Sequence, residues 1–275
     1  MKKMVNKKAL FIASIIILAI SLGSIALQEA WKSELASSIE ERNIEKIQYF
    51  IDERHLVNAR TRNGVPILIL ALLYKYEDIA KLIIESGADI NVSDSNGNTP
   101  IKVAAENGLT ETVELLMKKG GDVNEKFSDG SSALSYSVFN GHIRTSKALL
   151  DSGAAVNLPN RYGWTPLFLA AQKNNPEMIE MLLRYGADIN ANFGSGTALM
   201  VAAGNGSVEA LHLLIARGAD VHATAKNGIS ALDMATGHDD VLKELLRYQK
   251  QFSRGQKELE SNVTNLREES FCSNR

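Results

Sequence analysis

The sequence predicts an all-α solenoid, in which pairs of helices stack side by side along one axis. A tag similar to Gly-Ala-Asp recurs about every 33 residues, with its first glycine at Gly87, Gly120, Gly153, Gly186 and Gly218. An aliphatic residue keeps the same step, at Leu68, Ile101, Leu134, Leu167, Leu199 and Leu232. A small residue follows each of these three places later. A fixed period of this length indicates a repeat architecture rather than ordinary globular domains.

Residues 160–190 show how one period is built. Thr165-Pro166 is typical of a helix start, because proline is tolerated in a first turn, where its missing N–H costs nothing. Asn174-Asn175-Pro176 predicts a break, after which a second helix carries an apolar stripe at i, i+3 and i+4. Gly186 predicts a left-handed position at the end of that second helix. One pair of helices cannot bury its own apolar face, so neighbouring copies must cover it.

The recurring pattern Gly-x-Thr-Pro-Leu-x-x-Ala-Ala, then a helix, then Gly-Ala-Asp-x-Asn, resembles the ankyrin repeat family. The resemblance covers roughly residues 33–251. It implies paired helices joined by β-turn fingers, and it implies protein binding through the fingertips and the exposed side of the first helices. No enzymatic activity and no cofactor are implied.

Residues 1–27 predict a signal peptide or an N-terminal transmembrane anchor. Four lysines precede residues 9–27, which are uncharged and mostly apolar. Ser24-Ile25-Ala26 offers the small residues of a cleavage site. As an uncleaved helix, residues 9–27 would span about 28 Å, close to the hydrocarbon thickness of a bilayer. Either alternative places the lysines in the cytosol and the repeats on the non-cytoplasmic side, which is the periplasm in a bacterium.

The remaining segments follow in order. Residues 28–60 are expected to form a degenerate capping repeat of two helices, and residues 61–224 five ankyrin repeats, at roughly 61–93, 94–126, 127–159, 160–191 and 192–224. The fifth repeat is one residue short, so its finger should be tighter, with Gly194 and Gly196 supplying positive φ angles. Residues 225–251 predict a C-terminal capping repeat. Residues 252–275 predict a charged, disordered tail.

Composition excludes several functional classes. The net charge is −2, and four lysines lie ahead of the apolar run, so the body of the chain is more acidic still. A mildly acidic body argues against a nucleic-acid groove, which needs a basic stripe. Cys272 is the only cysteine, so neither an intramolecular disulfide nor a cysteine zinc site is possible.

No catalytic constellation stands out, and the chain is predicted not to be an enzyme. The five histidines show no metal-ligand spacing on one helix, so structural roles are favoured for all of them. No metal site and no cofactor site are expected.

A protein-binding surface is the functional site that the resemblance implies, once the family's exposed positions are carried over onto this chain. The predicted protein-binding residues are Tyr74, Phe139, Arg161, Tyr162, Trp164, Lys173 and Phe193. Aromatic and arginine side chains most often anchor interfaces. Two alternatives stay open: Trp164 and Phe193 pack on adjacent fingers, or Tyr74 packs on its own apolar repeat.

The sequence thus favours a non-enzymatic interaction scaffold, monomeric and either exported or membrane-tethered through residues 9–27. Its rigid repeats would bind a protein partner through the concave ankyrin surface. The alternatives are an immunity or inhibitor protein against a toxin or enzyme in the same compartment, and an accessory factor for a periplasmic enzyme, such as an antioxidant one.

Overall fold

A computed structural model describes residues 25–250. The cysteine, the predicted tail and all but the last residues of the predicted leader lie outside this range. By its internal contacts the chain divides into two units, Met1–Asp122 and Val123–Arg275, which are described separately. Within residues 25–250, no helix is both long enough and apolar enough to cross a bilayer.

Unit 1 consists of helix pairs. A helix runs through residues 25–40 and is followed by α2 (Ile44–Arg54), α3 (Ile67–Leu73), α4 (Glu77–Glu85), α5 (Pro100–Asn107) and α6 (Thr110–Lys118). The first helices α3 and α5 pack together, as do the second helices α4 and α6. Two helices, residues 25–40 and α2, precede the regular repeats, and the first of them includes the last three residues of the predicted leader.

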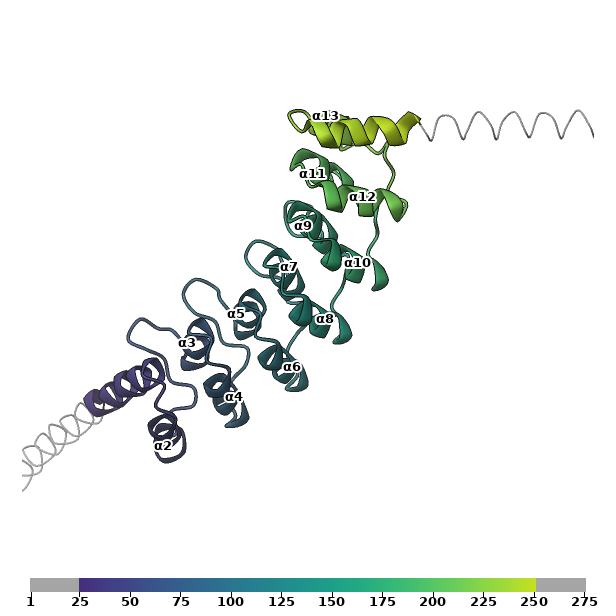
Figure 1. Ribbon diagram of the computed structural model, residues 1–275. Helices are drawn as coiled ribbons and strands as arrows, with labels where there is room; N and C mark the ends of the chain where they lie inside the picture. Colours follow the sequence, from purple (N-terminus) through teal and green to yellow (C-terminus); the bar gives the residue numbers. More distant parts are fainter. Residues whose placement is uncertain (1–24, 251–275) are drawn as a thin grey trace, which may run out of the picture. The chain divides into compact units, whose positions relative to one another are not determined.

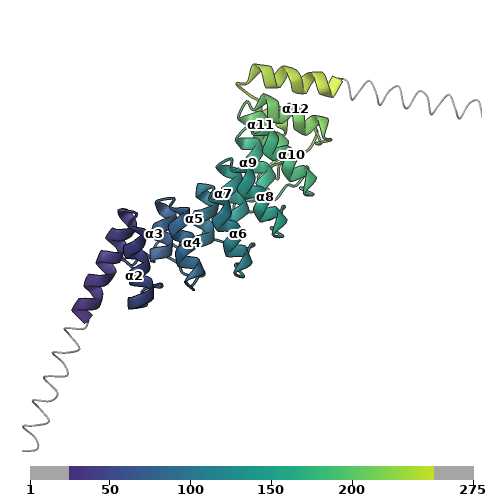
Figure 2. The same ribbon diagram turned by 60° about the horizontal axis from the view of Figure 1, so that its bottom comes forward.

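Unit 2 continues the pattern with α7 (Ala133–Phe139), α8 (Ile143–Asp151), α9 (Pro166–Gln172), α10 (Pro176–Arg184), α11 (Ala198–Gly204), α12 (Val208–Ala216), α13 (Ala231–Met234) and a helix over residues 239–250. The first helices α7, α9 and α11 form one row, and the second helices α8, α10 and α12 form another (Figures 1 and 2). Between residues 25 and 250, extended pairing is limited to isolated bridges such as Thr224 with Ser230. This arrangement is an α solenoid.

The fourth repeat folds as its turn residues predict. Thr165 caps α9, since its hydroxyl oxygen accepts the Phe168 N–H at 3.2 Å. Asn175 caps α10 in the same way. Gly186, just past α10, has a φ of +86°, the left-handed conformation that glycine adopts without steric cost. Gly194 and Gly196 also have positive φ angles, as predicted for these two glycines of the short fifth finger.

The recurring aliphatic anchors lie in the core of each unit. They are almost fully buried in five successive repeats, at Leu68, Ile101, Leu134, Leu167 and Leu199. Each buried side chain of this size stabilises the fold by about 1.5–3 kcal/mol relative to exposure. The sixth anchor, Leu232, is only half-buried.

An asparagine bracket joins neighbouring repeats behind the fingers. In unit 2, the Asn157 side-chain oxygen accepts the Asp188 N–H at 2.8 Å, and its amide donates to the Gly186 carbonyl at 3.2 Å. Asn124 and Asn190 accept the equivalent backbone N–H groups of the repeats that follow them. The Asn of the repeated Gly-Ala-Asp-x-Asn pattern therefore fixes the register between repeats.

The third repeat has an unusually polar interior. Ser137 and Ser146 are both fully buried, and their hydroxyl oxygens lie 2.8 Å apart, in hydrogen-bond contact between α7 and α8. At the Ser137 position, the other repeats carry alanine, as at Ala104 and Ala170. The buried pair satisfies hydroxyls that would otherwise be costly to remove from water.

Candidate functional site

A shallow apolar hollow lies on the finger side of unit 2, and we call it the aromatic groove. Its volume is about 190 Å³. It is lined by Asp129, Ser131, Ser135, Tyr136, Phe139, Asn160, Tyr162, Trp164 and Leu169. These residues belong to the third and fourth fingers and to the first helices α7 and α9, so the groove crosses the boundary between two repeats.

Stacked rings form one wall of the groove. The Tyr162 and Trp164 ring centroids are 5.1 Å apart, and Trp164 stacks almost parallel on Phe168 at 5.6 Å. Phe168 is buried in α9, Trp164 is half-buried, and Tyr162 is 55% exposed. Trp164 thus stacks on a ring of its own repeat, and Tyr162 is the more exposed of the two fingertip rings.

The opposite wall is the third finger, which is built differently from its neighbours. In the fourth finger Asn160 accepts the Tyr162 and Trp164 N–H groups, but the equivalent third-finger position holds a buried phenylalanine, Phe127. Asp129 closes that turn instead: its carboxylate accepts the Ser131 N–H at 3.0 Å and the Ser131 hydroxyl at 2.9 Å.

The Asp129 carboxylate also accepts the Tyr136 hydroxyl, at 3.3 Å. Partial burial of Asp129 opposes ionisation, but the donors on Ser131 and Tyr136 outweigh it and hold the Asp129 pKa below its ordinary value. The groove therefore contains a carboxylate that is ionised at neutral pH and already bonded within the finger.

A cation lies at the end of the groove near the C-termini of the first helices. Lys173, the C-cap of α9, places its ammonium nitrogen 3.9 Å from the centroid of the Phe139 ring. Phe139 is 39% exposed, so this cation–π contact is open to solvent and accessible to a ligand.

The fingertips of unit 2 are tied to one another. The Arg161 N–H donates to the Asp129 carbonyl at 3.2 Å, which joins the fourth finger to the third. The Ser195 hydroxyl donates to the Tyr162 carbonyl, which joins the fifth finger to the fourth. Phe193 is 55% exposed, and its backbone lies so close to Gly163 that a Cβ added there would be 2.8 Å from the Phe193 carbonyl oxygen.

The structure therefore gathers six of the seven predicted residues into one neighbourhood: Phe139, Arg161, Tyr162, Trp164, Lys173 and Phe193. Tyr74 belongs to unit 1, where it stacks on Tyr76 at 5.6 Å and remains 44% exposed. Sequence reasoning missed Tyr136 as a groove residue. The equivalent positions in the neighbouring repeats hold the aliphatic residues Val103 and Leu169. The aromatic residue at this position is the signal that could have identified Tyr136.

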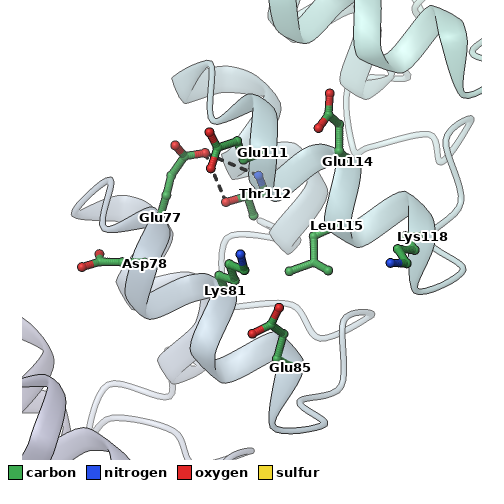
Figure 3. A pocket seen from close by; sticks show the side chains of 9 residues that line it. All are labelled: Glu77, Asp78, Lys81, Glu85, Glu111, Thr112, Glu114, Leu115 and Lys118. Carbon is green, nitrogen blue, oxygen red and sulfur yellow. Dashed lines mark hydrogen bonds between the residues drawn. The ribbon is translucent and has the colours of Figure 1, made fainter.

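A larger hollow of about 590 Å³ lies in unit 1, between the second helices α4 and α6 (Figure 3). Five carboxylates and two lysines line it, and the Glu77 carboxylate accepts the Thr112 N–H and hydroxyl, each at 3.4 Å. Burial opposes ionisation of Asp78, but the Arg42 guanidinium, 2.9 Å away, and backbone donors keep the Asp78 pKa below its usual range.

Across residues 25–250, no group of three or more metal-ligating side chains is placed to hold a metal ion. The aromatic groove is the better candidate for recognition, because its walls are apolar.

Comparison with known proteins agrees with this architecture. A family model described as ankyrin repeats (3 copies) matches residues 33–127, 101–193 and 192–255, which together cover well over half of the chain. A protein of Rickettsia bellii (strain RML369-C) that is named as an ankyrin repeat protein is 34% identical over 103 residues, which are 34% of this chain and 61% of that relative. The match thus spans about three fifths of the relative's length. The chain belongs to the ankyrin repeat family, whose repeats indicate a protein–protein interaction scaffold.

Proposed function

We propose that this chain binds a protein partner through the aromatic groove and the fingertips around it. The observation that carries the proposal is the Tyr162–Trp164–Phe168 stack, which presents an exposed ring on a buried base. Aromatic rings held in this way lose little conformational freedom on binding, so they anchor interfaces efficiently. The chain acts by binding alone, without catalysis.

Affinity enrichment with the full-length chain tests this proposal. Tyr162→Ala together with Phe139→Ala should remove the specifically captured partner, because both rings line the groove. Tyr49→Ala provides a matched control, since Tyr49 is 45% exposed in unit 1, outside the groove. Unchanged capture by the double variant, with its circular dichroism intact, would show that another surface binds the partner.

We also propose that the repeats lie on the non-cytoplasmic side of a membrane, exported or tethered through residues 9–27. The support is sequence alone: an uncharged apolar run that follows four lysines. Intact mass analysis of the protein recovered from soluble and membrane fractions distinguishes a cleaved form from an anchored one. Recovery of the full chain in the cytosolic fraction would contradict both forms.

A further inference from the structure

The first helices α7, α9 and α11 carry no charged residue. Their sequences are ALSYSVF in α7, PLFLAAQ in α9 and ALMVAAG in α11. The second helices α8 and α10, by contrast, each carry three charged side chains. Charge beside the groove therefore comes from the fingers and from Lys173, which ends α9.

The charges beside the groove are mainly cationic. Arg161 and Lys173 are both exposed, whereas the Asp129 carboxylate is bonded within its own finger. Glu125 and Lys126 are adjacent in the third finger and offset each other. Two exposed cations against the one ionised Asp129 carboxylate leave the rim with a single positive charge, on a chain whose net charge is −2.

We propose that the groove binds an extended segment of the partner in which an apolar side chain is flanked by aspartate or glutamate residues. This inference rests on the proposed function and specifies the chemistry of the partner. The apolar side chain would lie against Tyr162, Trp164 and Leu169, and the carboxylates would face Arg161 and Lys173. A basic segment would instead place its cations near those two residues, which costs affinity.

The two cations lie toward opposite ends of α9. Arg161 belongs to the finger that precedes the helix, and Lys173 follows its C-terminal end. Carboxylates on either side of the apolar side chain can therefore face them. The Lys173 ammonium already rests on the Phe139 ring, so less of its freedom is lost on binding.

Fluorescence anisotropy with three labelled peptides tests the inference, using the full chain in mild detergent. Each peptide has a central phenylalanine, flanked by Asp and Glu, by Lys and Arg, or by Ser and Gly. The acidic peptide should bind about tenfold or more tightly than the other two at low salt, and the difference should shrink as salt screens the exposed charges. In a Trp31→Phe variant, the remaining Trp164 should report binding by its own fluorescence.

Single charge removals test the two cations. Lys173→Gln and Arg161→Gln should each weaken the acidic peptide by about three- to fivefold, as expected for an exposed ion pair. Lys119→Gln is the matched control, because Lys119 is an exposed lysine that ends a helix in unit 1, and it should change nothing. Circular dichroism verifies that each variant is folded.

The outcomes separate this inference from the proposed function. Equal affinity for all three peptides, or a preference for the basic one, would overturn the inference while leaving partner capture through Tyr162 standing. Failure of the peptides together with unchanged capture by the Tyr162→Ala, Phe139→Ala variant would overturn both. The chain's own C-terminal residues Glu268, Glu269 and Phe271 share the proposed chemistry. Tighter peptide binding after removal of residues 252–275 would identify that tail, rather than a partner, as the occupant.

Discussion

The Ser137–Ser146 pair allows a quantitative test of what holds the third repeat together. Ser137→Ala removes one partner of the 2.8 Å contact and leaves the Ser146 hydroxyl buried without it. Losing a hydrogen bond and stranding a buried hydroxyl costs about 1–2 kcal/mol. The better helix propensity of alanine returns a few tenths of a kcal/mol. A net destabilisation of about 1 kcal/mol is expected. Ser146→Ala should cost less, because the Ser137 hydroxyl keeps the Leu134 carbonyl as its acceptor at 3.0 Å.

The double variant Ser137→Ala, Ser146→Ala should behave differently. Both desolvated hydroxyls are then absent, so the free energy of unfolding should return close to the wild-type value or exceed it. Urea unfolding followed by circular dichroism measures the free energy of unfolding of the wild type, the two single variants and the double variant, which together form a double-mutant cycle. A loss of about 1 kcal/mol corresponds to a Tm shift of about 2–4 °C for a chain of this size. If the double variant loses the sum of the two single losses, the hydroxyl contact is not the cause, and packing around α7 and α8 is.

Three further perturbations have expected outcomes. Asp129→Asn should be less stable than the wild type above about pH 4, because the folded-state pKa of Asp129 lies below its unfolded value. The difference in the free energy of unfolding should fade as the pH drops through that folded pKa. Chemical unfolding between pH 7 and pH 3 measures it, and a difference that grows in acid would contradict this reasoning. An alanine in the left-handed conformation costs about 1 kcal/mol of stability. Gly163→Ala should lower the free energy of unfolding by more than this, because the added Cβ would meet the Phe193 carbonyl oxygen. Gly153→Ala is the control, with similar φ and open space, and equal Tm losses for the two would refute the contact. Asn157→Ala should lower the stability by about 1 kcal/mol, because the hydrogen bond from the Asp188 N–H is lost. Hydrogen-exchange measurements should then show a faster rate at the Asp188 amide.

The sequence predicts the backbone of this protein well, because the repeat period and the turn residues agree. Pro166 and Ala198 begin first helices near the positions that the anchors Leu167 and Leu199 indicate, and Gly186 ends a repeat in the expected conformation. Such features depend on contacts within one repeat or with its immediate neighbours, which the period itself reveals.

The groove was less predictable, because it depends on how particular side chains turn. Whether Trp164 faced a partner or its own helix could not be read from spacing, since both suit an aromatic residue in a finger. In the structure, Trp164 is half-buried and stacks on the Phe168 ring of α9. Likewise, the third finger exchanges the usual polar turn residue for Phe127, and only the three-dimensional contacts show that Asp129 takes over its role.

The asparagine brackets also bear on how such a chain tolerates rearrangement. Each bracket joins residues about 31 positions apart and involves only two adjacent repeats. Deleting or duplicating one whole period would therefore create a new junction with the same acceptor and the same backbone donor, whereas a shift of a few residues would bring them out of alignment. Selection can in this way vary the length of the array, and the set of fingers that it displays, without redesigning any junction.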